Sequence, residues 1–158
     1  KLGHSLSPEL SDAQKKTLGA ELRRKFLDAI PGLEPLINAI KEKVRATGQL
    51  RGLDGRPIFC RAEHSAPNFL LQSAGAILSK RWVVIGQELL DEAGLTYDTD
   101  YTRCAYVHDE VQLSVVPSEA ERVSQLLEQA APLAGKYYKF RVPIAASAGT
   151  GKSWQETH

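Results

Sequence analysis

Three adjacent polar residues interrupt an apolar stretch of the chain and limit how that stretch can fold. The tripeptide His108-Asp109-Glu110 follows a β-prone run that ends at Val107 and precedes a run of alternating apolar and polar residues. Alternation with a period of two is typical of a half-buried strand. Because adjacent polar groups are costly to bury without partners, the pattern predicts a hairpin over residues 101–116 with the tripeptide at its tip.

The rest of the chain predicts helices separated by turns. Helices that pack on one face of a small antiparallel sheet make the expected fold class α+β. The expected elements, in chain order, are a basic helix from a capping box at Ser11–Gln14 to Pro31-Gly32, a helix from Leu33 to Gly48, two short strands flanking a turn at Leu53–Arg56, a long helix from Ser65 to Gly94, a helix from a second capping box at Ser118–Glu121 to Gly135, and a last strand over Tyr138–Ile144.

Composition sets broad limits on the protein class. The 158 residues are enough for one domain with a real core, and no apolar run approaches the length of a membrane span. No signal peptide is expected, because the first residues are polar and basic-amphipathic. The two cysteines, Cys60 and Cys104, have no metal-ligand spacing, so we expect buried free thiols, with a disulfide left open. A first residue Lys1 and the lack of methionine favour a processed, cut or trimmed chain.

The tripeptide at the hairpin tip carries chemistry suited to a divalent cation. On a regular strand, adjacent side chains point to opposite faces. At a turn this no longer holds, so one or both of Asp109 and Glu110 can reach a common ion. Carboxylate oxygens suit Mg²⁺ or Mn²⁺, and a magnesium site with one or two protein carboxylates usually takes its other ligands from water and substrate phosphates. The pattern therefore indicates phosphoryl transfer at a two-metal site completed by carboxylates from elsewhere. A solvated turn remains the alternative.

Two amides lie on one face of the long helix. Asn68 and Gln72 are four residues apart, with His64 shortly before them. Amides in a row can donate hydrogen bonds to the minor-groove acceptors present in every DNA base pair, which senses pairing geometry without reading sequence. Two solvent-facing amides are the alternative.

Together these segments resemble DNA polymerase family A, the group of bacterial DNA polymerase I and the phage replicative enzymes. The tripeptide within apolar strands is similar to motif C of that family, and the helix segment Asn68–Ala76 is similar to its palm helix. Gly52–Arg56 resembles the preceding palm hairpin, and Gly151–His158 the closing Gly-x-x-Trp-x-x-x-His. The order and spacing of these motifs agree with the family along nearly the whole chain. The residues within the motifs are more similar to those of the phage enzymes.

The resemblance implies a role for each matching position. Asp109 and Glu110 would be the catalytic, Mg²⁺-binding carboxylates of motif C, with Glu110 nearer to a support. His108 would contact the primer terminus, Asn68 and Gln72 the minor groove of primer-template DNA, and Arg56 and Arg61 the backbone phosphates. Residues 1–48 would form the distal fingers helices and the helix that returns to the palm, and residues 49–158 the palm.

The resemblance also implies what the chain needs from elsewhere. The family's motif A aspartate and the nucleotide-binding lysine and tyrosine of motif B have no counterpart in the sequence. We therefore expect the C-terminal part of a DNA polymerase, inactive until it is joined, in the same or a companion chain, to the portion that carries motifs A and B. Its partners would be primer-template DNA and a deoxynucleoside triphosphate, in the cytoplasm of a bacterium or phage-infected host, with no membrane.

Other functions find weaker support in the sequence. Ala146–Ser153 is one residue short of a phosphate-binding P-loop, but too few residues follow for the helix that such a loop needs. No serine or cysteine lies in a nucleophile elbow, and the four histidines have no zinc-site spacing. The main alternative is a non-catalytic DNA-binding or assembly module derived from a polymerase.

Overall fold

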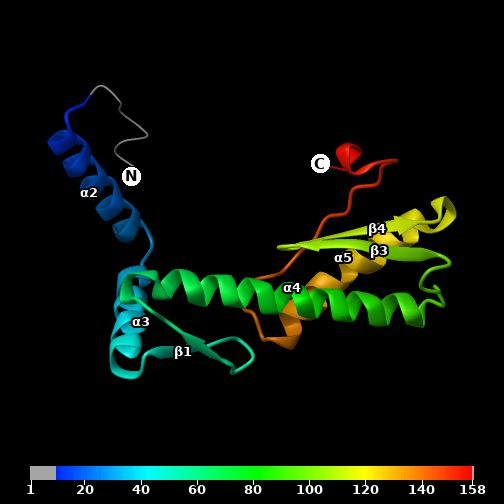
Figure 1. The fold of residues 1–158 in the computed structure, drawn as a ribbon, viewed down its shortest axis with the longest axis horizontal. Coiled ribbons are helices and arrows are strands. Elements are labelled where there is room, and N and C mark those ends of the chain that lie inside the picture. Colours follow the sequence, from blue (N-terminus) through cyan, green and yellow to red (C-terminus); the bar gives the residue numbers. More distant parts are fainter. Residues whose placement is uncertain (1–9, 158) are drawn as a thin grey trace. The chain divides into compact units, whose positions relative to one another are not determined.

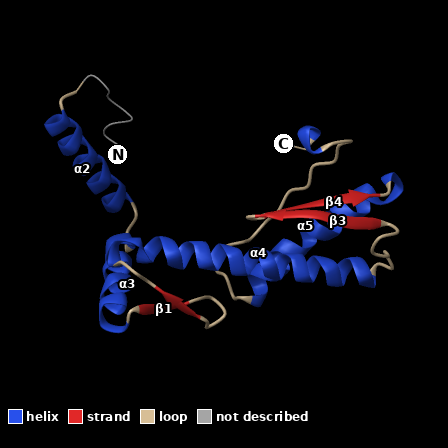
Figure 2. Cartoon of the chain, viewed as in Figure 1, coloured by secondary structure: helices blue, strands red, loops and turns tan. Residues whose placement is uncertain are grey.

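The computed structural model describes residues 10–157 and has the expected α+β composition (Figures 1 and 2). In this described part of the chain helices dominate, and each of the two sheets has two strands. The elements are α2 (Asp12–Ala29), α3 (Leu33–Thr47), β1 (Gln49–Arg51), β2 (Pro57–Phe59), the 3₁₀ turn η1 (Glu63–Ser65), α4 (Ala66–Glu92), β3 (Tyr101–Val107), β4 (Glu110–Val115), the 3₁₀ turn η2 (Pro117–Glu119), α5 (Ala120–Tyr137) and the 3₁₀ turn η3 (Trp154–Glu156).

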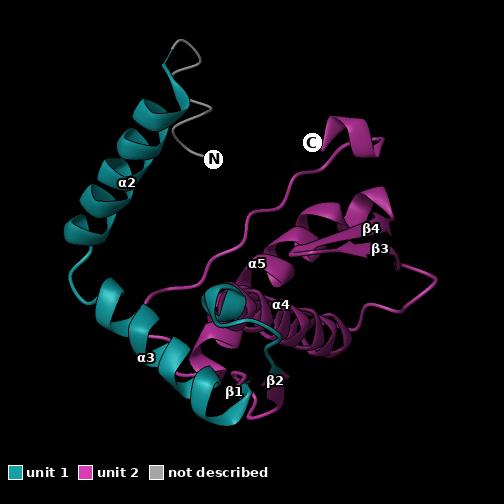
Figure 3. Ribbon diagram, turned by 60° about the vertical axis from the view of Figure 1, so that its left-hand side comes forward, with its two compact units in different colours: residues 1–50, 59–67 teal, residues 51–58, 68–158 magenta. Residues whose placement is uncertain are grey.

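The chain divides into two compact units (Figure 3). Unit 1 comprises Lys1–Leu50 and Phe59–Pro67, and unit 2 comprises Arg51–Ile58 and Asn68–His158. The assignment of residues 1–48 to fingers and of 49–158 to palm stays a prediction.

In the described part of unit 1, the ends of helices α2 and α3 follow the sequence signals. Ser11 caps α2, and its side chain and that of Gln14 each bond the other's backbone N–H, as the capping box predicts. Gly48 ends α3 at φ 70° and donates its N–H to the carbonyl of Val44 at 2.7 Å. The guanidinium of Arg45, in the last turn of α3, donates hydrogen bonds to both carboxylate oxygens of Glu63 at 3.0 and 2.7 Å, which holds η1 against α3.

In unit 2 the long helix α4 ends where glycine predicts. Gly94, at φ 77°, donates to the carbonyl of Asp91, and the N–H of Leu95 donates to the carbonyl of Leu90. This pair of bonds is a Schellman motif, which satisfies carbonyls at the helix end. Leu90 and Leu95 then join Tyr101 and Val123 in the buried core of unit 2. The end of α4 and the start of β3 are thereby held by one apolar cluster.

Helix α5 packs closely on α4 within unit 2. A Cβ atom built on Gly86 of α4 would lie 2.7 Å from the Leu127 Cδ2 of α5, so glycine allows a separation that a larger residue would prevent. The Trp82 indole N–H donates to the Leu127 carbonyl at 2.7 Å. These two contacts set the distance between the helices that support the β3–β4 hairpin.

The second capping box, expected at Ser118–Glu121, is wrong. Pro117 starts the 3₁₀ turn η2 one residue earlier, so Ser118 lies inside a turn instead of at an extended cap position. The residue that precedes α5 is Glu119, and its side chain makes no capping hydrogen bond.

The expected end of α5 at Gly135 and the strand over Tyr138–Ile144 are also wrong. Gly135 is buried inside the helix, and a Cβ there would lie 2.6 Å from the Cγ1 of Ile144, so this glycine serves packing. The helix ends instead in a Schellman motif with Lys139 at φ 56°, where Lys139 donates to Lys136 and Phe140 to Gly135. The chain then continues in loops without a strand partner.

Neither Cys60 nor Cys104 forms a disulfide bond, but the expectation that both thiols are buried is wrong. Cys60 is half-buried and Cys104 is exposed. Cys104 is the extra residue of a bulge, because the β3–β4 register shifts between Arg103 and Ala105. Over residues 10–157, no helix is both long and apolar enough to cross a membrane.

Candidate functional site

The predicted hairpin exists, and its tip is a two-residue turn. Val107 of β3 pairs with Glu110 of β4, which leaves His108 and Asp109 as the loop. His108 has a φ of 55°, in the left-handed region that favours glycine. Such a conformation costs about 1–2 kcal/mol for residues with a Cβ, although histidine tolerates it better than most. The tip is therefore a strained turn held by its surroundings, and strained turns of this type occur often at functional sites.

The two carboxylates at the tip differ in their surroundings. Asp109 is exposed, and within residues 10–157 it has no hydrogen-bond or ion-pair partner. Glu110 is half-buried and accepts a hydrogen bond from the side-chain amide of Gln112, its neighbour on the same strand face. Asp109 is thus available to a ligand from outside the chain, whereas Glu110 is already engaged within the hairpin.

The described residues fit part of a magnesium site. No three His, Cys, Asp or Glu side chains converge within residues 10–157, so no complete protein cage for a metal exists there. A free, exposed carboxylate such as Asp109 is nonetheless the kind of donor that Mg²⁺ uses when substrate phosphates, water and other acidic groups supply the remaining ligands. The donor set agrees with a shared site and disagrees with a self-contained one.

The tip is attached to α4 through a residue that the sequence did not single out. Ser79 is buried, donates its hydroxyl to the carbonyl of His108 at 3.2 Å, and also bonds the Tyr106 hydroxyl. These contacts join residues 27 and 29 positions apart. No local sequence signal reports such a contact, because a serine inside a helix usually bonds its own helix or faces water.

The two amides predicted to contact DNA lie on the face of α4 that includes Ser79. Asn68 and Gln72 are both exposed, and neither amide has a hydrogen-bond partner among residues 10–157. At 3.6 residues per turn, Asn68, Gln72 and Ser79 fall within about 40° of the helix circumference. One stripe of α4 therefore carries two unpaired amides and, further along, the serine that contacts the hairpin tip.

The two arginines predicted to contact phosphate are both exposed, in different units. Arg56 follows the β1–β2 turn and pairs with Asp54. Partial burial raises the pKa of the Asp54 carboxyl, but the hydrogen bonds and positive charge of Arg56 outweigh it and leave that pKa below its usual range. The Arg56 charge is thus partly neutralised within the turn, while Arg61 lies in the bend after β2.

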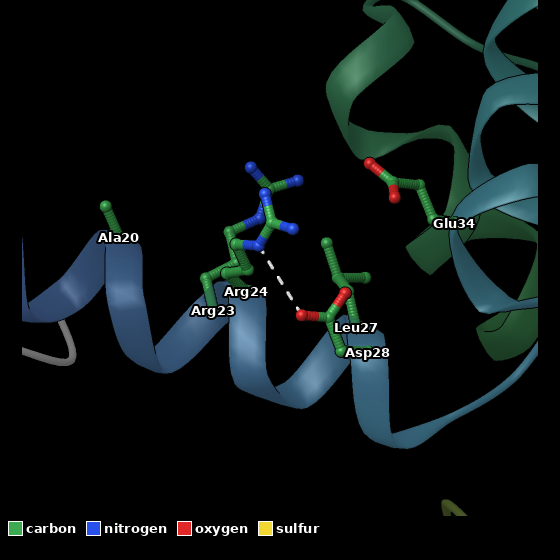
Figure 4. Close-up of a pocket in the computed structure, with 6 residues that line it drawn as sticks. All are labelled: Ala20, Arg23, Arg24, Leu27, Asp28 and Glu34. Atoms are coloured by element: carbon green, nitrogen blue, oxygen red, sulfur yellow. Dashed lines mark ion pairs between the residues drawn. The ribbon is translucent and has the colours of Figure 1, made fainter.

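The basic residues of α2 are partly paired among themselves. Figure 4 shows a shallow hollow in unit 1 where Arg23 and Arg24 rise from one turn of α2, with Arg24 joined to Asp28 at 3.5 Å. Lys25 bonds Glu21 at 2.8 Å, which lowers the pKa of the Glu21 carboxyl. This face resembles a solvated, ion-paired helix surface more than a preformed phosphate site.

The near-P-loop segment lacks the structure that binds phosphate. After Ser153 the chain forms only the three-residue turn η3. Backbone N–H groups that could receive phosphate are held by carboxylates, since Lys152 donates to Glu156 and Ala148 to Glu128, each at 2.8 Å. The segment has neither the helix dipole nor the free amides that a P-loop uses.

Comparison with known proteins places these observations in a family. The model of DNA polymerase family A matches residues 4–156. The DNA-directed DNA polymerases of Enterobacteria phage T3 and Escherichia phage T7 are each 32% identical to this chain, over 90% of it and 23% of their own length. DNA polymerase I of Aquifex aeolicus (strain VF5) is 26% identical over 98% of this chain and 25% of its own length.

A solved structure shares the fold. It is the POL domain of Pol1 from M. smegmatis, in complex with DNA primer-template and dNTP, and its TM-score with this chain is 0.76 at 21% identity. The match covers 98% of this chain and 28% of that one. The chain thus spans about a quarter of the length of the relatives that it matches.

Proposed function

The chain belongs to DNA polymerase family A, and from this premise we propose that it is a segment of a template-directed DNA polymerase that supplies one carboxylate, Asp109, to a two-metal nucleotidyl-transfer site. The observation that carries the proposal is the tip of the β3–β4 hairpin, where Asp109 is exposed and has no partner among residues 10–157. A metal site that is shared between this segment and the rest of the polymerase needs such a carboxylate.

Each residue at the hairpin tip would have a different role. Asp109 would hold Mg²⁺, and the bound Mg²⁺ would stabilise negative charge on the attacking and leaving oxygens during phosphoryl transfer. Glu110, already bonded to Gln112, would hold the hairpin backbone in place beside it. The exposed imidazole of His108 would contact the primer terminus from the same turn.

The stripe on α4 would position the DNA. Asn68 and Gln72 would donate hydrogen bonds to minor-groove acceptors, which every correctly formed base pair presents in similar places. Since both amides are exposed and without a partner among residues 10–157, binding DNA would replace only their bonds to water. Arg56 and Arg61 would meet backbone phosphate, where Arg56 would exchange its Asp54 partner for a stronger anion.

The proposal extends to partners and place of action. The segment would act with primer-template DNA, a deoxynucleoside triphosphate and the remaining polymerase portion that carries motifs A and B, in the same or a companion chain. The similarity to phage and bacterial polymerases supports action in the cytoplasm of a bacterium or an infected host. Without the remaining portion, the segment would bind DNA weakly and would not extend a primer.

Primer extension with an Asp109→Ala variant tests the proposal. In a polymerase that contains this segment, we expect the magnesium-dependent rate to fall about a thousandfold, because one metal loses its protein ligand. The dissociation constant for primer-template DNA should change by no more than about threefold, because Asp109 makes no DNA contact in the proposal. Glu92→Ala, which removes an exposed carboxylate at the end of α4, serves as the control. A normal extension rate for Asp109→Ala would favour the non-catalytic alternative.

A further inference from the structure

Ser79 occupies an unusual place for a serine. It is the one buried polar or charged residue among residues 10–157, with 8% of its surface exposed. Serine is a weak helix former that often bonds the carbonyl four residues earlier in its own helix. Ser79 instead directs its hydroxyl out of α4 toward the β3–β4 hairpin. A buried hydroxyl with partners only on another element has a structural or functional reason to be there.

The hydrogen bonds of Ser79 have a defined direction. A serine hydroxyl has one hydrogen, and Ser79 uses it on the carbonyl of His108 at 3.2 Å. The bond between Ser79 and Tyr106 must then run the other way, with the phenol donating to the serine oxygen. The result is a directed chain from Tyr106 through Ser79 to the His108 carbonyl, in which each bond polarises and strengthens the next.

The carbonyl at the end of this chain controls the direction of Asp109. The His108 carbonyl belongs to the peptide group that joins His108 to Asp109, and a peptide group is planar up to the next Cα atom. When Ser79 fixes that oxygen, it fixes the plane that carries the Asp109 Cα. The strained φ of 55° at His108 needs such restraint, because a turn without it can relax to a less costly conformation.

We propose that Ser79, supported by Tyr106, is a positioning residue that sets the orientation of Asp109 relative to α4. The inference rests on the proposed function and deepens it. Ser79 shares one stripe of α4 with Asn68 and Gln72, so a helix that holds the primer-template through those amides also holds the carboxylate hairpin through Ser79. Errors in the distance between DNA and carboxylate are costly, since a misplacement of about 1 Å can reduce a rate about a hundredfold.

The test uses a polymerase that contains this segment, with variants Ser79→Ala, Ser79→Thr and Tyr106→Phe. For Ser79→Ala we expect kcat for primer extension to fall about tenfold, with the KM for deoxynucleotide within about twofold of wild type. The Mg²⁺ concentration for half-maximal rate should rise about threefold, because a misdirected Asp109 binds metal less well. Ser79→Thr, which keeps the hydroxyl, should recover most of kcat.

Tyr106→Phe tests whether the Tyr106 hydroxyl acts through Ser79 or whether the bond from Ser79 to the His108 carbonyl acts alone. Ser79 keeps its bond to the carbonyl in this variant, so we expect kcat to fall only about threefold. Ser79→Ala with Tyr106→Phe should match Ser79→Ala alone, because the phenol acts through the serine hydroxyl. Ser114→Ala, which removes an exposed hydroxyl from β4, should behave as wild type. Two independent losses that add in the double variant would overturn the directed chain.

Two measurements distinguish a positioning role of Ser79 from a folding defect and from a failure of the proposed function. The burst amplitude of the first turnover counts active molecules, so a variant that only misfolds loses amplitude and keeps its rate and Mg²⁺ requirement. That result for Ser79→Ala would overturn the positioning role. So would wild-type kcat and Mg²⁺ requirement in Ser79→Ala while Asp109→Ala is inactive. Normal extension by Asp109→Ala would instead overturn the proposed function.

Discussion

Replacing His108 by glycine should make the hairpin more stable and the polymerase slower. At φ 55° the histidine backbone is destabilised by about 1–2 kcal/mol relative to glycine in the same conformation. Glycine loses more backbone entropy on folding, which offsets about 0.5–1 kcal/mol of this stabilisation. His108 is exposed, so its side chain gives up no buried contact. The net effect should stabilise the hairpin by about 0.5–1 kcal/mol.

Native-state hydrogen exchange measures this local effect. A gain of about 0.5–1 kcal/mol slows exchange of the Val107 and Glu110 amides by about two- to fivefold, if the hairpin opens locally. His108→Ala should speed the same exchange, because alanine keeps a Cβ in the strained turn and tolerates the left-handed region less well than histidine. Both variants lack the imidazole, so both should extend primers more slowly if it contacts the primer terminus.

We expect the two variants to change the stability of the hairpin in opposite directions and to slow primer extension equally. The pair therefore separates the effect of backbone strain from the effect of losing the imidazole. Faster amide exchange in His108→Gly would show that the positive φ of His108 does not strain the turn. Primer extension at the wild-type rate in both variants would refute a role for the imidazole. His108→Asn, which tolerates the left-handed region, should lie between them in stability.

Further predictions concern packing and charge. Gly75→Ala should stabilise α4 by about 1 kcal/mol, since a Cβ there meets nothing within 4 Å, and slower amide exchange in α4 would report it. Gly135→Ala should destabilise α5 by about 1–2 kcal/mol despite the same gain in helix propensity, since its Cβ would lie 2.6 Å from Ile144; unchanged exchange in α5 would contradict this close packing. Glu63→Gln should reduce the protection of η1 at neutral pH. The hydrogen bond and charge of Arg45 lower the pKa of the Glu63 carboxyl, so the pair contributes fully above the usual glutamate pKa of about 4.3 and is lost as pH falls through the lowered pKa. The wild type and the variant should therefore converge in acid; a difference that persists there would contradict the assignment.

Local patterns predicted most of the elements correctly. The turn at His108-Asp109 follows from a polar tripeptide between apolar runs, and the ends of α3 and α4 follow from Gly48 and Gly94. Each of these signals acts over a few residues, so the sequence alone contains the cause.

The errors arise where distant residues or a neighbouring turn decide. Gly135 resembles a helix stop, but its role depends on Ile144, which packs against it from the loop beyond the helix end. Pro117 begins a turn that displaces the expected cap at Ser118. The contact from Ser79 to His108 spans 29 positions and involves a residue type with no special pattern, so only the fold reveals it.

Metal binding by Asp109 can be measured by counting bound Mn²⁺ with electron paramagnetic resonance. The sample is a polymerase containing this segment, with primer-template and a non-hydrolysable deoxynucleotide, compared with its Asp109→Asn variant. We expect about two Mn²⁺ per wild-type complex. In the variant, we expect at least a tenfold loss of affinity at one site, with DNA binding unchanged. Equal Mn²⁺ number and affinity in both proteins would show that Asp109 is not a metal ligand.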